Sequence, residues 1–238
     1  MQVDGAVLPS DGHKAEGVTY VALRDLLAAF GDWDVSWSHE HQAAVARSGE
    51  DTVTAGVGDE FVTVSGVRHQ LPGSVYLREG RTYVPLRSVA EALGAQVEWD
   101  RFLGGAAVAS PDFDLPCSAS DFYWLSRIIS AESRGEPAVG QVAVGNVVLN
   151  RVASEEFPNT IPEVVFDTKN AVQFEPVENG TVHLEPTEQS VESAKRALSG
   201  EKPAGDSLYF FAPSLSRGLW ISGNRPYYTT IGCHQFYL

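Results

Sequence analysis

The sequence is poor in sulfur and in long hydrophobic runs. Its 238 residues include only two cysteines and one methionine, and two cysteines alone cannot supply the four ligands of a structural zinc site. No stretch approaches the roughly 20 apolar residues that cross a bilayer as a helix. We therefore expect neither a cysteine-based metal centre nor a membrane span.

Basic residues are outnumbered throughout the chain. There are 17 Lys and Arg against 31 Asp and Glu, which gives a formal net charge of −14. Residues 1–112 carry 8 basic and 16 acidic groups, and residues 113–238 carry 9 and 15. Because nucleic-acid backbones are bound by basic surfaces, we expect no nucleic-acid partner. The hydrophobic content of 43% is that of an ordinary globular protein.

The two cysteines, Cys117 and Cys233, lie 116 residues apart. This spacing is compatible with one disulfide that closes a long loop, worth about 4–5 kcal/mol in the chain-entropy model. It is equally compatible with two unrelated buried thiols.

The first half contains an internal repeat. Residues 17–24 (Gly-Val-Thr-Tyr-Val-Ala-Leu-Arg) return 63 residues later as residues 80–87 (Gly-Arg-Thr-Tyr-Val-Pro-Leu-Arg), and both copies continue to a glycine and then to Val-x-Trp. Each copy predicts a short strand, a helix of two or three turns closed by glycine, and one or two further strands. Residues 1–110 are therefore predicted to form a small α+β domain.

This repeated pattern resembles the copper amine oxidase N-terminal-like domain, over roughly residues 3–110. The resemblance implies a non-catalytic stalk, a spacer or wall-associated module common in secreted proteins of Gram-positive spore-formers, without copper chemistry. Pro, Ser and Asp gather in residues 111–120, which we interpret as a linker to a second domain, residues 121–238.

The second domain is predicted to begin with a helix whose apolar face includes a carboxylate. Asp121 is expected to be the N-cap of this helix, which runs to Arg134. At 100° per residue, Glu132 points between Leu125 and Ile128 and therefore toward the core.

Glu132 has two interpretations at this point. Burial raises the pKa of a carboxyl group, and a carboxyl protonated near neutral pH can act as a general acid and then as a base. Alternatively, it forms a structural ion pair with one of three nearby arginines: Arg127, Arg134 or Arg151.

The remainder of the second half combines a buried helix with aromatic strands. The helix after Pro137 is apolar on nearly every side, which is typical of the centre of a domain. The last 30 residues predict short strands, among them residues 208–212 (Leu-Tyr-Phe-Phe-Ala) and 218–221 (Gly-Leu-Trp-Ile). Such aromatic side chains suit stacking on sugar rings beside an acid, and they serve equally well as core.

The second half carries several separated motifs. They occupy residues 124–137 (Trp-Leu-Ser-Arg-Ile-Ile-Ser-Ala-Glu-Ser-Arg-Gly-Glu-Pro), 140–152 (Gly-Gln-Val-Ala-Val-Gly-Asn-Val-Val-Leu-Asn-Arg-Val), 157–160 (Phe-Pro-Asn-Thr), 208–213 (Leu-Tyr-Phe-Phe-Ala-Pro), 220 (Trp), 225–226 (Arg-Pro) and 231–236 (Ile-Gly-x-His-x-Phe). Together they closely resemble the cell wall hydrolase family of the SleB-type spore cortex-lytic enzymes, over nearly all of residues 121–236. The resemblance implies a lysozyme-like, mainly α fold with a small β element, related to lytic transglycosylases. We therefore expect an α+β chain overall.

The family resemblance also implies an activity. It is cleavage of the bond between N-acetylmuramic acid and N-acetylglucosamine in peptidoglycan, leaving a 1,6-anhydro end, during germination or wall remodelling. Glu132 matches the family's catalytic glutamate, and Glu136 matches a second acid for which we expect a supporting role. The resemblance implies no metal and no cofactor.

Further side chains are expected to support the acid or to bind substrate. Three aromatic residues are candidates for the walls of sugar subsites, two amides for holding the N-acetyl group, and one histidine lies in the last motif: Tyr209, Phe210, Trp220, Gln141, Asn150 and His234.

Cys233 departs from the family, which often has a basic residue there. Since Cys117 lies just before the first helix, the resemblance favours a disulfide that ties the two ends of the domain.

One acid suffices for transglycosylation. A two-carboxylate hydrolase needs a second group as nucleophile or base, whereas in a transglycosylase the 6-hydroxyl of the substrate attacks the anomeric carbon. Glu132 then protonates the leaving oxygen and takes the proton of that hydroxyl.

Two other functional classes are open. An amidase that cuts the glycan–peptide link usually needs zinc, and residues 121–238 offer only His183 and His234, without a His-Glu-x-x-His motif. The other class is a non-catalytic wall-binding protein.

The expected partners are peptidoglycan glycan strands, and a regulatory or inhibitory protein partner is left open. We expect an exported protein of the cell wall or the spore cortex or coat, whose signal peptide is not part of this sequence, because residues 1–5 lack the features of one.

Overall fold

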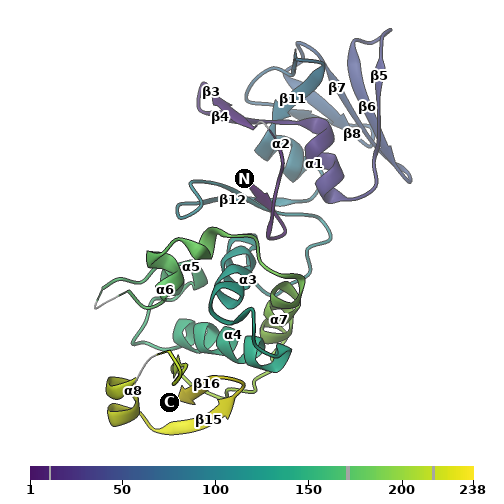
Figure 1. The fold of residues 1–238 in the computed structure, drawn as a ribbon. Coiled ribbons are helices and arrows are strands. Elements are labelled where there is room, and N and C mark those ends of the chain that lie inside the picture. Colours follow the sequence, from purple (N-terminus) through teal and green to yellow (C-terminus); the bar gives the residue numbers. More distant parts are fainter. Residues whose placement is uncertain (11, 170–171, 216–217) are drawn as a thin grey trace. The chain divides into compact units, whose positions relative to one another are not determined.

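The computed structural model describes residues 1–10, 12–169, 172–215 and 218–238. The chain divides into two compact units, Met1–Phe113 and Asp114–Leu238 (Figure 1). Strands dominate the first unit, whereas the second consists mainly of helices with one small sheet. The predicted α+β class, a sheet-rich repeat module followed by a mainly helical part, is confirmed.

The internal repeat forms the same strand, helix and hairpin twice. The first copy comprises β4 (Val18–Ala22), α1 (Leu23–Phe30), β5 (Asp34–Ser38) and β6 (Ala43–Ser48); the second comprises β11 (Arg81–Pro85), α2 (Leu86–Ala92), β12 (Gln96–Asp100) and β13 (Gly105–Ala109). Strands β4 and β11 pair antiparallel, with Val21 opposite Val84. Because these valines are repeat equivalents, an approximate twofold axis relates the two copies at this pair.

Seven further strands extend the sheets of the first unit. They are β1 (Gln2–Val3), β2 (Ala6–Val7), β3 (His13–Ala15), β7 (Asp51–Gly56), β8 (Phe61–Val64), β9 (Val67–Gln70) and β10 (Tyr76–Arg78). The strand orders are β12-β13-β1-β2, β10-β11-β4-β3 and β5-β6-β7-β8-β9. The hairpin of each copy therefore belongs to a different sheet, while the strands that precede the two helices share one.

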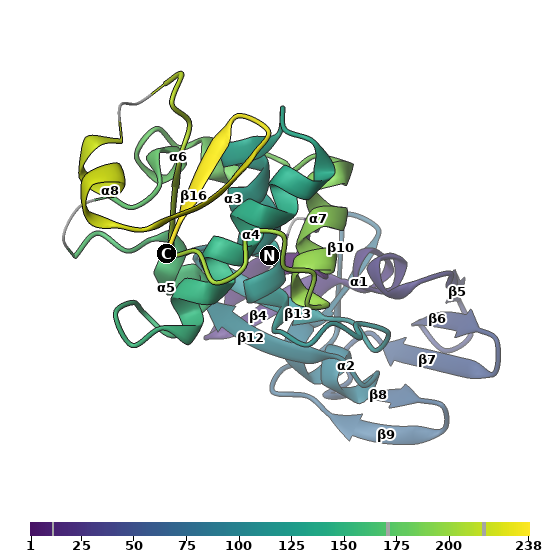
Figure 2. The ribbon, with the colours of Figure 1, turned by 90° about the horizontal axis from the view of Figure 1, so that it is seen from below.

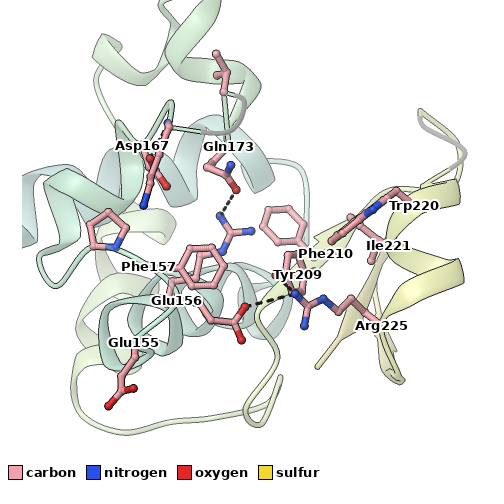
Figure 3. A pocket seen from close by; sticks show the side chains of 14 residues that line it. Glu155, Glu156, Phe157, Asp167, Gln173, Tyr209, Phe210, Trp220, Ile221 and Arg225 are labelled. Atoms are coloured by element: carbon pink, nitrogen blue, oxygen red, sulfur yellow. Dashed lines mark hydrogen bonds and ion pairs between the residues drawn. The ribbon is translucent and has the colours of Figure 1, made fainter.

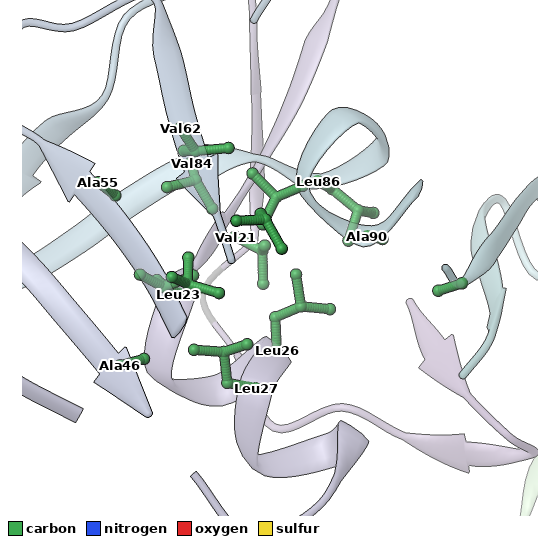
Figure 4. Packing of buried hydrophobic residues seen from close by; sticks show 14 of the residues in the cluster. Val21, Leu23, Leu26, Leu27, Ala46, Ala55, Val62, Val84, Leu86 and Ala90 are labelled. Carbon is green, nitrogen blue, oxygen red and sulfur yellow. The ribbon is translucent and has the colours of Figure 1, made fainter. Parts of the chain in front are cut away.

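The core of the first unit lies around its two helices. In α1, Leu23, Leu26 and Leu27 recur at the spacing that places them on one face, and all three are buried. Leu86 and Ala90 of α2 are buried in the same cluster (Figure 4). The helices thus hold the strands of both copies in a single core.

The second unit is built around three helices. Its helices are α3 (Ala119–Ser133), α4 (Ala138–Ala153), α5 (Ile161–Val165), α6 (Glu175–Glu178), the 3-10 turn η1 (Thr181–His183), α7 (Glu188–Leu198) and α8 (Leu219–Asn224). Helices α3, α4 and α7 pack against one another. Strands β14 (Tyr209–Phe211), β15 (Tyr227–Ile231) and β16 (His234–Tyr237) form a sheet of order β14-β16-β15, which contacts α4 (Figures 1 and 2). Within the described ranges, no helix combines the length and apolarity needed to cross a membrane.

Two local predictions are wrong. Helix α3 begins at Ala119 and its N-cap is Ser118, whose hydroxyl accepts a hydrogen bond from the Asp121 amide (3.1 Å). Asp121 is therefore the third helical residue of a capping box, not the cap. Trp220 lies on α8 instead of a strand; Gly218, at a φ of 52°, turns the chain into this short helix, and a short apolar run does not distinguish strand from helix.

Candidate active site

Glu132 lies on the last turn of α3, at the wall of a cavity of about 330 Å³. Ser130 and Ala131 of the same helix line this cavity, and Glu175 and Pro176 line it from α6. The Glu132 side chain is partly buried. The helix thus holds a carboxyl group at an accessible but largely desolvated position.

The surroundings of Glu132 alter its protonation. Burial raises its pKa to about 7, the negative charge of Glu175 adds to this rise, and the positive charge of Arg151 opposes it. Burial has this effect because the charged form loses more hydration than the neutral form. At neutral pH both protonation states of Glu132 are therefore populated, so the group can donate a proton and then accept one.

Removing the charge of Glu175 is expected to shift the pH dependence of activity. In Glu175→Gln, the pKa of Glu132 falls because one of the two causes that raise it, the charge of residue 175, is removed, while the other, burial, remains. In the transglycosylation that the motifs predict, the first step needs protonated Glu132, so the alkaline limb of the pH–rate profile is expected to move to lower pH by a fraction of a unit. Turbidity loss of suspended sacculi measures this. Glu178→Gln, on the same short helix, is the matched control, and an alkaline limb that stays or moves upward contradicts the prediction.

The three arginines do not form the structural ion pair that was the alternative for Glu132. Arg127 pairs with Glu185 (3.0 Å), and Arg151 is hydrogen-bonded within the neighbouring groove. Arg134 lines the same cavity as Glu132 but forms no ion pair with it. Among the residues that the structure describes, none donates a hydrogen bond to the Glu132 carboxylate.

A larger groove of about 960 Å³ brings together the three predicted aromatic residues (Figure 3). Tyr209 and Phe210 come from β14 and Trp220 from α8. The Trp220 side chain is 60% exposed, and its ring lies edge-on to that of Tyr209 at 6.0 Å. Phe157 completes this aromatic lining. The groove therefore offers flat apolar surfaces that remain open to a ligand.

Two arginines form hydrogen bonds and an ion pair with side chains that line the groove. Arg225 donates to the Tyr209 hydroxyl (2.7 Å) and pairs with Glu156 (3.4 Å). Arg151, which is buried, donates to Gln173 (3.3 Å). Burial lowers the pKa of Arg151 to about 10, which still leaves it charged at neutral pH. The groove thus carries charges of both signs, with Glu155, Glu156 and Asp167 in its lining beside Arg151, Lys169 and Arg225.

The groove and the cavity of Glu132 share no lining residue, but two segments of chain contribute to both. Gln173 lines the groove, and Glu175, two residues later, lines the cavity. Likewise Phe210 lines the groove and Leu215 lines the cavity. Arg151 of the groove also lies close enough to Glu132 for its charge to affect the pKa of that carboxyl.

Gln141 and Asn150 are wrong as candidates for holding an N-acetyl group. Gln141 is fully buried; its amide donates to the carbonyl of Glu136 (3.2 Å) and accepts from the Ser190 hydroxyl (2.8 Å). Asn150 donates both amide hydrogens to backbone carbonyls of the segment that follows α7 (2.9 Å each). Both amides stabilise the fold instead of facing a ligand.

Glu136 and His234 lie outside both the groove and the cavity. The Glu136 carboxylate accepts from the backbone amide of Cys233 (2.8 Å), and a Cβ atom at Gly232 would collide with it. His234 is buried behind Phe210, at 5.3 Å between rings, and burial lowers its pKa. Glu136 therefore anchors the β15–β16 turn, and His234 supports the aromatic lining from behind.

The expected disulfide is not formed. Cys117 and Cys233 are not bonded to each other. Cys117 precedes α3, whereas Cys233 contacts Glu136, which follows the other end of that helix. A helix of 15 residues is about 22 Å long, and the Cα atoms of a disulfide lie about 4–7 Å apart. The Cys233 thiol instead donates to the Glu136 carboxylate, which raises the pKa of this thiol.

Sequence reasoning missed Glu175 as a neighbour of Glu132. It begins a helix of only four residues, and so short an element shows no periodicity that would indicate which side chains face a cavity. The electrostatic role of Arg151 was also missed, since the sequence offered it only as a direct ion-pair partner.

Comparison with known proteins finds a family match in each of the two units. Residues 135–237 match the model of the family described as Cell Wall Hydrolase, and residues 3–102 match that of the Copper amine oxidase N-terminal domain. The chain is 33% identical over 117 residues to the cell wall hydrolase CwlJ of Halalkalibacterium halodurans, which covers 44% of this chain and 80% of that protein. The chain belongs to the cell wall hydrolase family. The two family matches confirm both resemblances read from the motifs.

Other relatives are similar over a smaller share of their length. The spore cortex-lytic enzyme of Bacillus cereus is 40% identical over 119 residues, half of this chain and 44% of that enzyme. The one of Bacillus subtilis is 37% identical over 119 residues, covering 50% of this chain and 38% of that enzyme. The chain thus spans less than half the length of these relatives.

A solved structure is also similar to this chain. It is the catalytic domain of the germination-specific lytic transglycosylase SleB from Bacillus anthracis, with 38% identity and a TM-score of 0.47, covering 52% of this chain and 98% of that chain. The match to the family model begins three residues after Glu132. The site geometry is therefore the main support for Glu132.

Proposed function

We propose that this cell wall hydrolase cleaves the glycan strands of peptidoglycan at the bond between N-acetylmuramic acid and N-acetylglucosamine, with Glu132 as the acid. One observation carries the proposal: a partly buried carboxyl group with a pKa of about 7 lines a cavity, and Arg151 of the aromatic-lined groove lies near enough to affect that pKa. The names of the cortex-lytic relatives support peptidoglycan as the polymer.

The reaction that one such carboxyl can complete is transglycosylation. Protonated Glu132 donates its proton to the glycosidic oxygen as the bond from this oxygen to the anomeric carbon breaks. The 6-hydroxyl of the same muramyl residue attacks the anomeric carbon and loses its proton to the Glu132 carboxylate. The products are a free 4-hydroxyl on N-acetylglucosamine and a 1,6-anhydro muramyl end. Glu132 finishes protonated, so the cycle needs no other acid or base.

The groove is proposed to hold the strand during this reaction. Tyr209, Phe210 and Trp220 stack against the apolar faces of successive sugar rings, since aromatic rings offer large rigid contact areas. Arg225 lies beside them and can donate to the acetyl or carboxylate oxygens of the polymer. Both groups act by orientation, which holds the scissile bond near Glu132.

Hydrolysis with Glu175 as the base is a second candidate. Glu175 lines the same cavity as Glu132, and an inverting glycosidase uses a second carboxylate to activate a water on the far side of the sugar. In that case the product keeps a reducing end, and Glu175→Gln abolishes activity instead of shifting its pH dependence.

Mass spectrometry of the released muropeptides tests the proposal. Purified spore cortex and vegetative peptidoglycan are digested, and the products are analysed before and after borohydride reduction. Fragments that resist reduction and are lighter by one water support transglycosylation. Reducible ends favour hydrolysis through Glu175, and released stem peptides, with activity lost in EDTA, indicate an amidase. The more rapidly digested polymer identifies the substrate as cortex or cell wall, where we propose that this exported protein acts.

A further inference from the structure

The first unit contains two pockets related by its internal repeat. The smaller, of about 140 Å³, is formed by the start of α1, by β5 and by residues 80–82 of the other copy. The larger, of about 380 Å³, is formed by the start of α2, by β12 and by residues 17–19 of the other copy. Nine of the ten residues that line the smaller pocket have their repeat equivalents in the larger. Each pocket is therefore built from both copies, as the twofold relation requires.

Each pocket has a tryptophan in its wall and an arginine that holds the neighbouring backbone. Arg24 and Arg87 are equivalent, and each donates to the carbonyl two residues before the tryptophan of its own copy. Trp37, in the smaller pocket, is partly buried, whereas Trp99, in the larger, is 62% exposed. The larger pocket therefore presents a positioned aromatic ring to solvent.

An ion pair explains why the smaller pocket is narrow. Arg81, which lines it, pairs with Asp25 (2.8 Å). The repeat equivalents of these two residues at the larger pocket are Val18 and Ser88, and neither can form an ion pair. The same architecture thus exists in a closed and an open form within one unit.

The open pocket also differs in charge. Lys14 lines it, whereas the repeat equivalent of Lys14 is Leu77. Among the described residues, Lys14 forms no ion pair, although acidic groups outnumber basic ones two to one in this half. Glu98 also lines this pocket. An aromatic ring and a cation together suit a sugar ring that carries a carboxylate.

We propose that this open pocket, lined by Trp99, Lys14 and Glu98, is a second binding site for the peptidoglycan glycan strand. Trp99 stacks against a sugar ring, and Lys14 pairs with a carboxylate of the lactyl group or peptide stem. The inference rests on the proposed function only for the identity of the polymer. Since both units then bind one insoluble polymer, release at the groove leaves the chain held at the first unit, and the local concentration of sites stays high.

Sedimentation with insoluble sacculi tests the inference. The full chain carrying Glu132→Gln is used, so that the polymer is not cleaved, and bound protein is measured against sacculus concentration. Trp99→Ala is expected to weaken binding about tenfold, the loss of one aromatic contact of about 1.4 kcal/mol. Trp37→Ala is the matched control and is expected to change binding less than twofold.

Exchanging the ion pair between the copies provides a test that keeps both tryptophans. The double variant Val18→Arg with Ser88→Asp closes the open pocket and is expected to weaken binding as Trp99→Ala does. Arg81→Val with Asp25→Ser opens the closed pocket and is expected to strengthen binding. If Trp99→Ala and the closing variant bind as tightly as the parent, the inference is overturned.

The two proposals fail separately. Cleavage detected by mass spectrometry, together with sedimentation that is indifferent to Trp99, overturns the second site alone. Sedimentation that depends on Trp99, without any released fragment from the unsubstituted protein, supports the second site and overturns the proposed function alone.

Discussion

Replacing Glu132 with glutamine is expected to reduce fragment release from sacculi about a thousandfold, because general acid–base catalysis contributes about a hundredfold to ten-thousandfold. Glutamine has nearly the same shape but can neither donate nor accept the reacting proton. Binding to sacculi is expected to remain, since the groove and the first unit are unchanged. Fragment release and sedimentation, measured on the same preparation, distinguish these two effects.

The same substitution is expected to stabilise the second unit at alkaline pH. The pKa of Glu132 is raised from 4.5 to about 7, so the folded unit binds more protons than the unfolded chain between these values, and its stability falls as pH rises through them. Glutamine removes this loss. The free energy of unfolding of the second unit is therefore expected to rise by up to about 3 kcal/mol above pH 7 and to stay unchanged below pH 4.

Urea unfolding at pH 4 and at pH 8 measures this difference, with Glu178→Gln as the exposed control. A variant that releases fragments at the parent's rate excludes Glu132 as the acid. A variant that is inactive but gains no stability at pH 8 contradicts the raised pKa while leaving the catalytic assignment intact. An inactive variant that no longer binds sacculi contradicts the separation of binding from chemistry.

Replacing Asn150 with alanine is expected to destabilise the second unit without altering substrate binding. Its amide donates to the carbonyls of Gly205 and Ser207, at 2.9 Å each, and Asn150 itself is 9% exposed. Alanine leaves both carbonyls without this donor, and each unsatisfied buried group costs about 1–3 kcal/mol. We expect a loss of about 2–4 kcal/mol in the free energy of unfolding, which urea unfolding measures.

The activity of folded Asn150→Ala distinguishes the two roles considered for this side chain. If it only supports the fold, the KM for soluble glycan fragments stays within about twofold of the parent at temperatures where the variant is folded. A raised KM with unchanged stability would restore Asn150 as a substrate ligand. Asn159→Ala, which removes an exposed amide, is the control and is expected to change neither quantity.

The parts of the site that depend on local periodicity could be predicted from sequence. The helical spacing placed Glu132 toward the interior, and α3 does hold it at a partly buried wall. The aromatic segments placed Tyr209 and Phe210 on a strand, where they line the groove. The direction of the Glu132 side chain follows from its own helix. Adjacent strand residues such as Tyr209 and Phe210 point to opposite faces, so the tertiary structure decides that both line one groove.

The roles of the polar side chains could not be predicted in this way. Gln141 and Asn150 lie on a helix that the sequence identified as central, yet whether an amide faces a ligand or a backbone carbonyl depends on which distant segment packs against it. The segment that follows α7 contacts Asn150 more than 50 residues along the chain. Likewise, the position of Cys233 beside Glu136 depends on how the β15–β16 turn folds back.

The sequence by itself determined the repeat, the α+β class, the family and the position of Glu132, because these depend on periodicity and motifs. Only the tertiary structure decided that Glu175 and Arg151 modify the pKa that burial raises at Glu132, that the cysteines remain apart, and that one of two equivalent pockets is open. Charges act through space, and their effect depends on distances between segments that are remote in sequence. The Arg81–Asp25 pair also depends on segments that are remote in sequence. Its residues lie 56 positions apart, and they close a pocket only because the two copies of the repeat pack against each other.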